Sequence, residues 1–218
     1  AGPPTEISLS TAPLFDGNAN VTGRMAILVD ITERKKTEAQ VLNIATGVSA
    51  ATGETFFHSL VEHLATSLGA DLAYIGELLE TERVRTIAVH AEGKPADNFE
   101  YELEGTPCES VVNKSLCAYP SGVQVLFPKD KGLVQKRIEG YVGVPLFDST
   151  KHPLGLIAVL FREPIRNSAM AESMLRIFGV RAAVELERMR SEKQIERQVQ
   201  RLGALRAIDG AINNSLDL

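Results

Sequence analysis

Two cysteines, Cys108 and Cys117, are the residues of this chain that could most readily perform chemistry. Thr106, Pro107 and Glu109 have the order of a capping box at the start of a helix. Cys108 would lie in the first turn of that helix, where the helix dipole favours a thiolate. Cys117 follows nine residues later, so a redox pair or a thioether to a cofactor is conceivable. The alternative is that both thiols are small buried hydrophobic groups, as free cysteines usually are.

Four aromatic side chains provide a second candidate site. We expect Tyr101, Tyr119, Phe127 and Tyr141 to converge on the face of a β-sheet that lies opposite its flanking helices. Small-molecule sites are mostly apolar with a few polar groups, and tyrosine supplies both. The same side chains would also suit a collapsed core that binds no ligand, and the sequence leaves these two alternatives open.

Other kinds of chemical site find little support in the residue pattern. His58 and His63 are five residues apart on one expected helix, whereas two metal ligands on one helix face need a spacing of four. His90 and His152 stand alone at an expected strand end and an expected turn, where solvent exposure is the simpler interpretation. We find no glycine-rich phosphate loop and no paired catalytic carboxylates, and we expect no metal site.

The composition limits the classes of function. The chain has 218 residues, of which 44% are hydrophobic, enough for one full domain with additional segments. Its net charge of −5 argues against a nucleic-acid-binding surface, which needs clustered positive charge. No apolar run approaches the roughly 20 residues that span a bilayer, and no secretory signal is present. We therefore expect a cytoplasmic location without membrane contact by these residues.

Two adjacent segments predict a pair of strands near the middle of the chain. Gly140–Phe147 alternates between two sides, and Leu154–Phe161 is apolar almost throughout, as expected for a strand buried on both faces. Asp148, Ser149 and Pro153 supply residues that favour a turn between them. Within the first strand, one side carries Val142, Val144 and Leu146, and the other carries Tyr141, Gly143 and Pro145.

The flanking segments predict helices and further strands. Val41, Ile44 and Val48 have helical spacing, and a second helix with apolar residues from Phe57 to Leu68 ends at Gly69. Strands are predicted in three segments, and a long helix is predicted from Ser168 past Arg201, with Asn167 or Ser168 as its cap. The three strand segments are Leu72–Leu79, Arg83–His90 and Asn98–Leu103.

This order of elements, over residues 36–190, resembles that of a GAF domain, the small sensory module of bacterial signalling proteins. Three short motifs add to the resemblance: Gly-Thr-Pro-Cys-Glu at 105–109, Cys-x-Tyr-Pro at 117–120 and Phe-Pro-x-Asp at 127–130. The resemblance implies an α+β fold, an antiparallel sheet with helices on one face. It also implies a sensory function, with an unidentified small molecule bound in the irregular segment between the strands. The candidate ligand-binding residues are Tyr101, Cys108, Cys117, Tyr119, Phe127 and Tyr141.

Two thiol-dependent classes of GAF protein match less well. GAF domains of the phytochrome type attach a bilin to a cysteine that is typically followed by histidine, whereas Ala118 follows Cys117 here. The free methionine sulfoxide reductases also use a GAF fold. An enzyme of that kind would need Cys108 as an activated nucleophile and Cys117 as the resolving thiol, and no nearby base is visible in the sequence. We therefore expect no catalysis by these residues and retain the reductase as a minor alternative.

The cyclic-nucleotide-binding class of GAF domains is matched only in part. Asn113, Lys114, Phe127 and Asp130 resemble its Asn-Lys, Phe and Asp-Glu signature. The final acidic residue is replaced by Lys131, and the spacing from phenylalanine to aspartate is one residue short. Asn113 and Lys114 are also ordinary residues for the end of a helix. The sequence does not identify any cofactor or ligand.

The segments before and after this region resemble parts of other signalling domains. Residues 1–35 contain two expected strands and an Asp-Ile-Thr triplet at 30–32, and resemble the C-terminal hairpin and exit of a PAS domain. Residues 191–218 are expected to form a signalling helix and the start of a following domain, with a second GAF domain as the best match. We expect the chain to belong to a longer sensor kinase or cyclic-di-GMP enzyme whose output domain lies elsewhere.

The long helix is predicted to pair with its copy in a parallel homodimer. Its narrow apolar seam is flanked by charged residues, and the helix is too long to pack on one domain alone. Two stripes are out of heptad phase, which could mark a stutter. We expect ligand or redox state to shift this helix; the alternative is a ligand-free domain that serves only for dimerisation and relay. The expected pairing residues are Leu186, Met189, Ile195, Val199 and Leu202, with Ala182 in the first stripe.

Overall fold

A computed structural model describes residues 7–15, 21–30, 52–79, 82–113 and 115–216. The chain divides into two units, Ala1–Ser49 and Ala50–Leu218. In the first, β1 (Ile7–Phe15) and β2 (Val21–Asp30) form an antiparallel hairpin in which Ile7 lies opposite Asp30. The predicted helix at Val41, Ile44 and Val48 lies outside the described residues.

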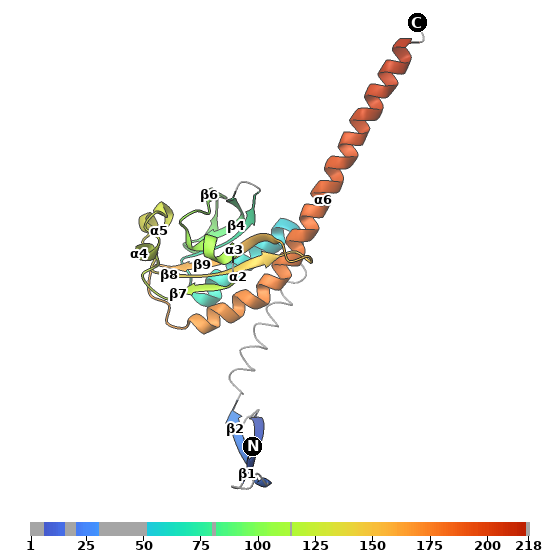
Figure 1. Ribbon diagram of the computed structural model, residues 1–218. Helices are drawn as coiled ribbons and strands as arrows, with labels where there is room; N and C mark the ends of the chain where they lie inside the picture. Colours follow the sequence, from blue (N-terminus) through green and yellow to red (C-terminus); the bar gives the residue numbers. More distant parts are fainter. Residues whose placement is uncertain (1–6, 16–20, 31–51, 80–81, 114, 217–218) are drawn as a thin grey trace, which may run out of the picture. The chain divides into compact units, whose positions relative to one another are not determined.

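The second unit is built on one antiparallel sheet (Figure 1). Its strands run in the order β5-β4-β3-β9-β8-β7, and β6 pairs with β4 beyond this path. The last two predicted strands match the structure closely, whereas β5 and β7 were not predicted. The strands are β3 (Leu72–Leu78), β4 (Arg83–Ala91), β5 (Lys94–Ala96), β6 (Glu100–Glu102), β7 (Cys117–Tyr119), β8 (Gly140–Phe147) and β9 (Pro153–Phe161).

Two long helices, α2 (Gly53–Leu68) and α6 (Ser168–Leu216), pack against each other and on the sheet. Three short helices lie in the connection between β6 and β8: α3 (Pro107–Asn113), α4 (Val123–Leu126) and α5 (Lys131–Lys136). Figure 1 shows α6 continuing well past the sheet. The expected α+β architecture, an antiparallel sheet with a long C-terminal helix, is therefore confirmed.

The central strand β9 is buried on both faces, as its apolar sequence predicts. Leu156, Ala158 and Leu160 belong to a hydrophobic cluster that includes residues of α3, such as Cys108 and Val111. The alternate residues of β9 point to the opposite face, where α2 and α6 pack. The sheet is thus covered by long helices on one face and by the irregular connection on the other.

The ends of the helices show one confirmed signal and one difference. Gly69 ends α2 in the left-handed conformation with φ of 63°, as predicted for a C-terminal glycine. The expected capping box is wrong in detail. Glu109 accepts a hydrogen bond from the backbone N–H of Gly105 at 2.9 Å, and the Thr106 hydroxyl donates to the carbonyl of Leu103 at 2.7 Å. These contacts close the turn before α3 and do not cap its first amides.

The start of α2 is capped by a residue of α6. Thr52 makes no side-chain cap, and Glu185 instead accepts a hydrogen bond from the N–H of Gly53 at 2.5 Å. The Glu185 side chain is buried, and the hydrogen bond from Arg188 holds its pKa below the ordinary value despite burial. A carboxylate at a helix N-terminus is favourable, so this contact fixes α2 to α6.

The two apolar stripes predicted on α6 have different environments. Leu186 is only 2% exposed and packs in the core of its own domain, so the expectation that it meets a second chain is wrong. Met189 is half-buried, whereas Ile195, Val199 and Leu202 are 58–63% exposed. The helix runs through residue 190 without interruption. Among the described residues, no helix is long and apolar enough to cross a membrane.

The contact between β3 and β9 depends on a missing side chain. A Cβ atom on Gly155 would lie 2.0 Å from the carbonyl oxygen of Gly76 on the neighbouring strand. We expect Gly155→Ala to lower the free energy of unfolding by about 1–3 kcal/mol, because the two strands must separate locally. Urea unfolding followed by circular dichroism measures this change. Gly203→Ala is the control, since its Cβ would meet no atom within 4 Å; an equal loss in both variants would contradict the prediction.

Candidate functional site

A cavity of about 390 Å³ lies on the sheet face opposite the long helices. Its walls come from β3, β6, β8 and β9 of the sheet and from α3 and α5 of the irregular connection. The volume lies at the lower end of the range for small-molecule sites, roughly 300–1,000 Å³. Apolar walls are formed by Leu72, Pro107, Leu133 and Leu160, and aromatic walls by Tyr74, Phe99, Tyr101 and Tyr141.

The polar groups of the inner wall form one chain of hydrogen bonds. The Tyr74 hydroxyl lies 3.1 Å from the hydroxyl of Tyr101 and 3.1 Å from the Cys108 sulfur. The Cys108 sulfur in turn lies 3.2 Å from the hydroxyl of Tyr141. Four groups that come from three strands and one helix are thereby joined at the base of the cavity.

The strand geometry explains how these side chains meet. Tyr74 and Tyr141 lie on strands that both flank β9, and each points to the face away from α2 and α6. Gly143 leaves room for the Tyr141 ring, because a Cβ atom there would lie 2.4 Å from the tyrosine hydroxyl oxygen. Tyr101 is brought in by β6, which pairs with β4 through Val84. The placement therefore depends on long-range strand pairing.

All four groups of this hydrogen-bonded chain of side chains are neutral at neutral pH. Burial raises the pKa values of Tyr74, Tyr101 and Tyr141 well above their ordinary values. Burial also raises the pKa of the Cys108 thiol. The expected stabilisation of a thiolate by the dipole of α3 is therefore outweighed by burial, and the base of the cavity presents O–H and S–H groups without charge.

The charged residues of the cavity come from β6 and from α5 with its cap. Glu100, Asp130 and Lys136 line it, and Glu100 and Lys136 are exposed. Asp130 caps α5 by accepting hydrogen bonds from the N–H groups of Gly132 at 3.0 Å and Leu133 at 3.2 Å. Burial raises the pKa of Asp130 even though these two contacts oppose the change.

Three of the six predicted ligand-binding residues line this cavity and three do not. Tyr101, Cys108 and Tyr141 are in its wall. Tyr119 packs against the rings of Phe127 and Tyr141, with centroids 5.2 and 6.1 Å away, and Cys117 packs at the edge of the same hydrophobic cluster. These three predicted residues support the cluster from outside the cavity.

Several lining residues were not predicted. Tyr74 and Leu72 lie on β3, whose sequence predicts only a buried strand and does not mark which side faces a ligand. Phe99 was assigned to an alternating strand but not to a site. Asp130 was considered in the Phe-Pro-x-Asp motif and in a nucleotide signature but not as a helix cap or a lining residue, although its position before Lys131 and Gly132 is a recognisable helix-cap signal.

The cysteines and histidines give no second reactive cluster. Cys108 and Cys117 do not form a disulfide bond with each other, and Cys108 is buried. Among the described residues, no group of three histidine, cysteine or acidic side chains could hold a metal ion. His90 is 5% exposed, so the expectation of a solvated side chain is wrong for it, and its Nδ1 atom has no hydrogen-bond partner among those residues.

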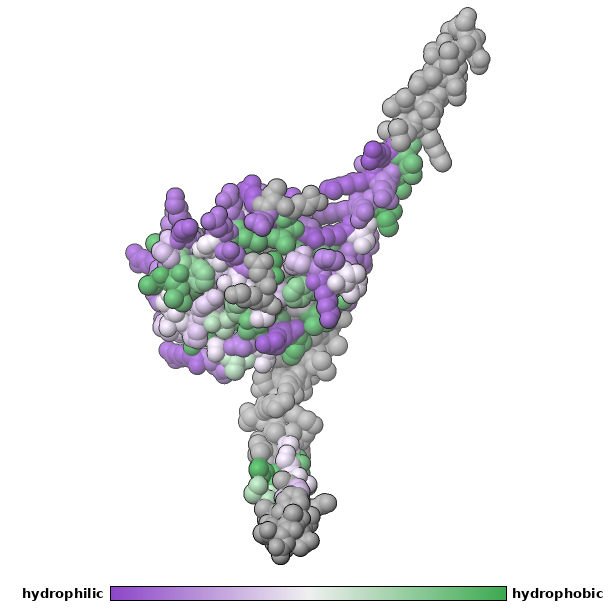
Figure 2. Space-filling model, in the orientation of Figure 1, coloured by the Kyte–Doolittle hydropathy of each residue, from purple (hydrophilic) through white to green (hydrophobic). Residues whose placement is uncertain are grey.

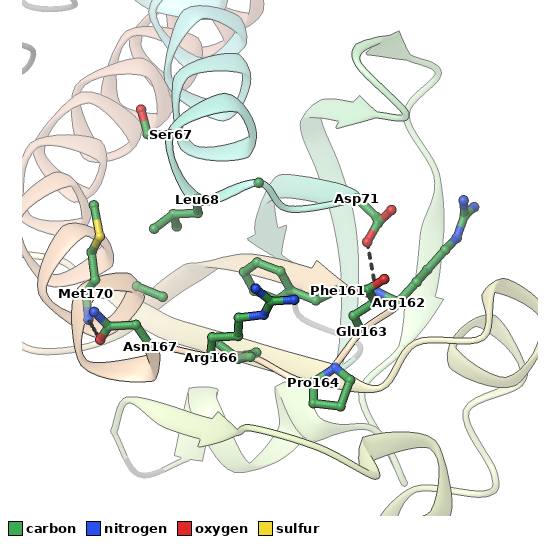
Figure 3. Close-up of a pocket in the computed structure, with 13 residues that line it drawn as sticks. Ser67, Leu68, Asp71, Phe161, Arg162, Glu163, Pro164, Arg166, Asn167 and Met170 are labelled. Carbon is green, nitrogen blue, oxygen red and sulfur yellow. Dashed lines mark hydrogen bonds between the residues drawn. The ribbon is translucent and has the colours of Figure 1, made fainter.

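A second cavity, of about 580 Å³, lies where β9 connects to α6 (Figure 3). Figure 3 shows Asp71 facing the backbone N–H of Arg162, which donates to the Asp71 carboxylate at 2.8 Å, while the Arg162 side chain extends away from the cavity. Asn167 accepts a hydrogen bond from the N–H of Met170 at 3.1 Å and caps α6. These polar groups already serve the connection, so the tyrosine-lined cavity is the better candidate site.

The raised pKa of Cys108 gives a measurable difference between the two thiols. We expect iodoacetamide at neutral pH to modify Cys117 and to leave Cys108 intact, because the buried thiol is both inaccessible and protonated. As the pH rises, Cys108 should react only at pH values above the ordinary pKa of a thiol. Peptide mass spectrometry measures both rates, with unfolded protein as the control in which both thiols react. Faster reaction of Cys108 at neutral pH would contradict this prediction and favour a thiol enzyme.

Comparison with known proteins identifies solved structures that share this architecture. No protein-family model matches the sequence, and no curated protein matches it. Among solved structures, the GAF domain of a phosphoenolpyruvate-protein phosphotransferase from Coxiella burnetii matches with a TM-score of 0.61 and 14% identity, covering 72% of this chain and 96% of that one.

Two further solved structures agree. The GAF domain of the Acinetobacter phosphoenolpyruvate-protein phosphotransferase gives a TM-score of 0.57 at 14% identity, covering 73% of this chain and 98% of that one. The chromophore-binding domain of the Stigmatella aurantiaca bacteriophytochrome gives 0.58 at 15% identity, covering 77% of this chain and 67% of that one. The second unit of the chain therefore has the GAF fold.

Proposed function

We propose that this GAF-fold unit is a sensory module that binds a small molecule in the tyrosine-lined cavity. The observation that carries the proposal is the hydrogen-bonded chain from Tyr101 through Tyr74 and Cys108 to Tyr141 at the base of a cavity of about 390 Å³. An apolar cavity with a few convergent polar groups is the usual form of a small-molecule site. A GAF fold in signalling proteins is consistent with this role.

A direct path joins the cavity to the helix that leaves the domain. Strand β3 carries Tyr74 at the cavity and Glu77 near its other end. Arg190 of α6 donates to the Glu77 carboxylate at 2.8 Å and to the backbone carbonyls of Leu78 at 2.6 Å and Leu154 at 2.8 Å. Although burial acts to raise it, the hydrogen bonds from Arg190 and Arg85 hold the pKa of Glu77 below its ordinary value. We propose that ligand binding at β3 changes the position of α6 through Arg190.

The exposed side of α6 suits a second copy of the chain. Val180, Val184, Ile195, Val199 and Leu202 are 54–71% exposed. Val184 and Ile195 are eleven residues apart, which is about three helical turns, so all five share one face. Figure 2 shows hydrophobic residues on one side of α6 beyond the sheet and hydrophilic residues beside them. We propose that this face, and not the buried stripe with Leu186, forms a parallel homodimer.

The second candidate function is a ligand-free unit that only dimerises and relays. The exposed face of α6 supports this alternative, because it exists whether or not the cavity is occupied. The cavity favours the sensory function, since a domain that only dimerises has no need of an unfilled, tyrosine-lined space. The two functions make different predictions for the purified protein.

The wider setting is also a proposal. We propose that the hairpin β1–β2 is the end of a PAS domain, that a second GAF domain follows α6, and that an output domain of a cytoplasmic sensor protein receives the signal. We further propose that these residues perform no catalysis. The burial of Cys108 and its raised pKa support this, because a thiol nucleophile needs an accessible thiolate.

Native mass spectrometry of the purified chain, beside a denatured control, tests the sensory function. We expect a dimer that carries an additional mass, and we expect that mass to be lost on denaturation. Tyr74→Phe and Tyr141→Phe should reduce the retained mass, because each removes a hydroxyl from the base of the cavity. Tyr119→Phe is the matched control outside the cavity. A dimer without added mass would favour the relay alternative, and a monomer would contradict dimerisation in both.

Disulfide crosslinking tests the proposed pairing face. In a Cys117→Ser background, we expect Val199→Cys to form a covalent dimer in most of the protein under mild oxidation, since Val199 lies on the exposed apolar face. Arg197→Cys is the control, because two residues on a helix turn its side chain to nearly the opposite face. Non-reducing gel electrophoresis measures the covalent dimer, and equal crosslinking of both variants would contradict a specific parallel pair.

A further inference from the structure

We infer that the tyrosine-lined cavity binds a small, flat, uncharged aromatic molecule that carries a hydrogen-bond acceptor at one end. This inference rests on the proposed sensory function and names the chemical class of its ligand. It follows from the volume of the cavity, from the rings in its wall, from the hydrogens available at its base and from the charges along its lining.

The volume limits the ligand to one or two rings. At roughly 30 Å³ for each water in the liquid, the cavity of about 390 Å³ has room for about a dozen waters. A ligand with a similar number of non-hydrogen atoms would therefore occupy it. A nucleotide or a tetrapyrrole is too large to enter without displacing the helices of the irregular connection.

The wall favours an aromatic ring. Tyr74 packs edge-to-face against Phe99 and Tyr101, with ring centroids 5.7 and 6.2 Å away. Leu133 and Leu160 contribute aliphatic surface to the same lining. Flat rings gain both apolar burial and edge-to-face contacts from such a wall, whereas a flexible aliphatic chain gains only the burial and loses more conformational freedom.

The hydrogen-bonded chain leaves one donor for the ligand. Each of Tyr101, Tyr74, Cys108 and Tyr141 carries one hydrogen, and three contacts join the four groups. Three contacts use three hydrogens. The fourth hydrogen stays on one of the four groups, and when it stays on Tyr101, the least buried of them, it needs an acceptor. A carbonyl oxygen or a ring nitrogen of the ligand would supply that acceptor.

The charges along the cavity disfavour an ionised ligand. Lys136 is the one cation among the lining residues, and it is exposed, whereas Glu100 and Asp130 would repel an anion. A cation at the base of the cavity would meet only uncharged O–H and S–H groups, because the two carboxylates belong to Asp130 at the cap of α5 and to the exposed Glu100. Burying an unpaired charge is costly, so a neutral molecule fits this cavity best.

An indole series tests the inference, because the protein contains no tryptophan and an indole can be excited selectively beside its tyrosines. The probes are indole-3-carboxamide, its anionic counterpart indole-3-carboxylate, cationic tryptamine, and 3-methylindole, which lacks the acceptor. Fluorescence titration of the purified dimer or monomer, after removal of any retained ligand, gives four dissociation constants. We expect the carboxamide to bind at least tenfold more tightly than each of the other three.

Variants identify the binding place. Tyr101→Phe and Tyr141→Phe each remove one end of the chain, and we expect at least one to weaken carboxamide binding by about threefold to tenfold. Leu133→Phe should weaken all four probes, because it fills the cavity. Tyr119→Phe should change no constant, since Tyr119 does not line the cavity. Thermal unfolding of each variant shows that it is folded.

Each other outcome would overturn the inference in a defined way. Tighter binding of the carboxylate or of tryptamine would show a charged ligand, and equal binding of 3-methylindole would show that no acceptor is needed. If the dissociation constant of the carboxamide is unchanged in all three cavity variants, the probe binds outside this cavity. Absence of binding by all four probes would exclude this aromatic class. In every case the retained mass in native mass spectrometry decides the sensory function separately.

Discussion

The burial of β9 on both faces is the constraint on which the rest of this domain depends. A strand whose consecutive residues Leu156, Ile157, Ala158 and Val159 are all buried must be covered above and below. Helices α2 and α6 cover one face closely with long apolar stripes. The other face is covered by short helices and loops that must also connect β6 to β8, and this less regular cover leaves the cavity. The burial of β9 on both faces therefore accounts for both the layers of the fold and the position of the candidate site.

The same arrangement explains why the cavity is polar only at its base. Strands bring tyrosines to the buried face at Tyr74 and Tyr141, and each hydroxyl needs a partner there. Cys108 supplies a small, uncharged partner between them, which a carboxylate or an amine could not do without the cost of burying its charge. The thiol is thus better explained as a structural hydrogen-bonding group than as a nucleophile.

The regular elements could be predicted from the sequence, and the site only in part. Periodicity identified β8, β9 and α2, because these segments bury apolar residues at fixed spacing. It could not show that Leu186 faces the domain while Val180 and Val184 face outward, since both stripes are apolar and only packing distinguishes them. Tyr74 was not predicted to line the site for a related reason. Its partners, Tyr101 and Cys108, are 27 and 34 residues away and meet it only through strand pairing.

The hydrogen bond from Gly53 to Glu185 has a consequence for the order of events in this chain. The first helix of the domain begins at that glycine, and the last helix carries that carboxylate. The first and last helices of the domain are therefore joined by this hydrogen bond, besides their apolar packing, on the face away from the cavity. A displacement of Gly53 would strain its hydrogen bond to α6 without involving the tyrosines. The start of α2, through Glu185, and strand β3, through Arg190, are thus two separate points at which α6 is attached to the domain.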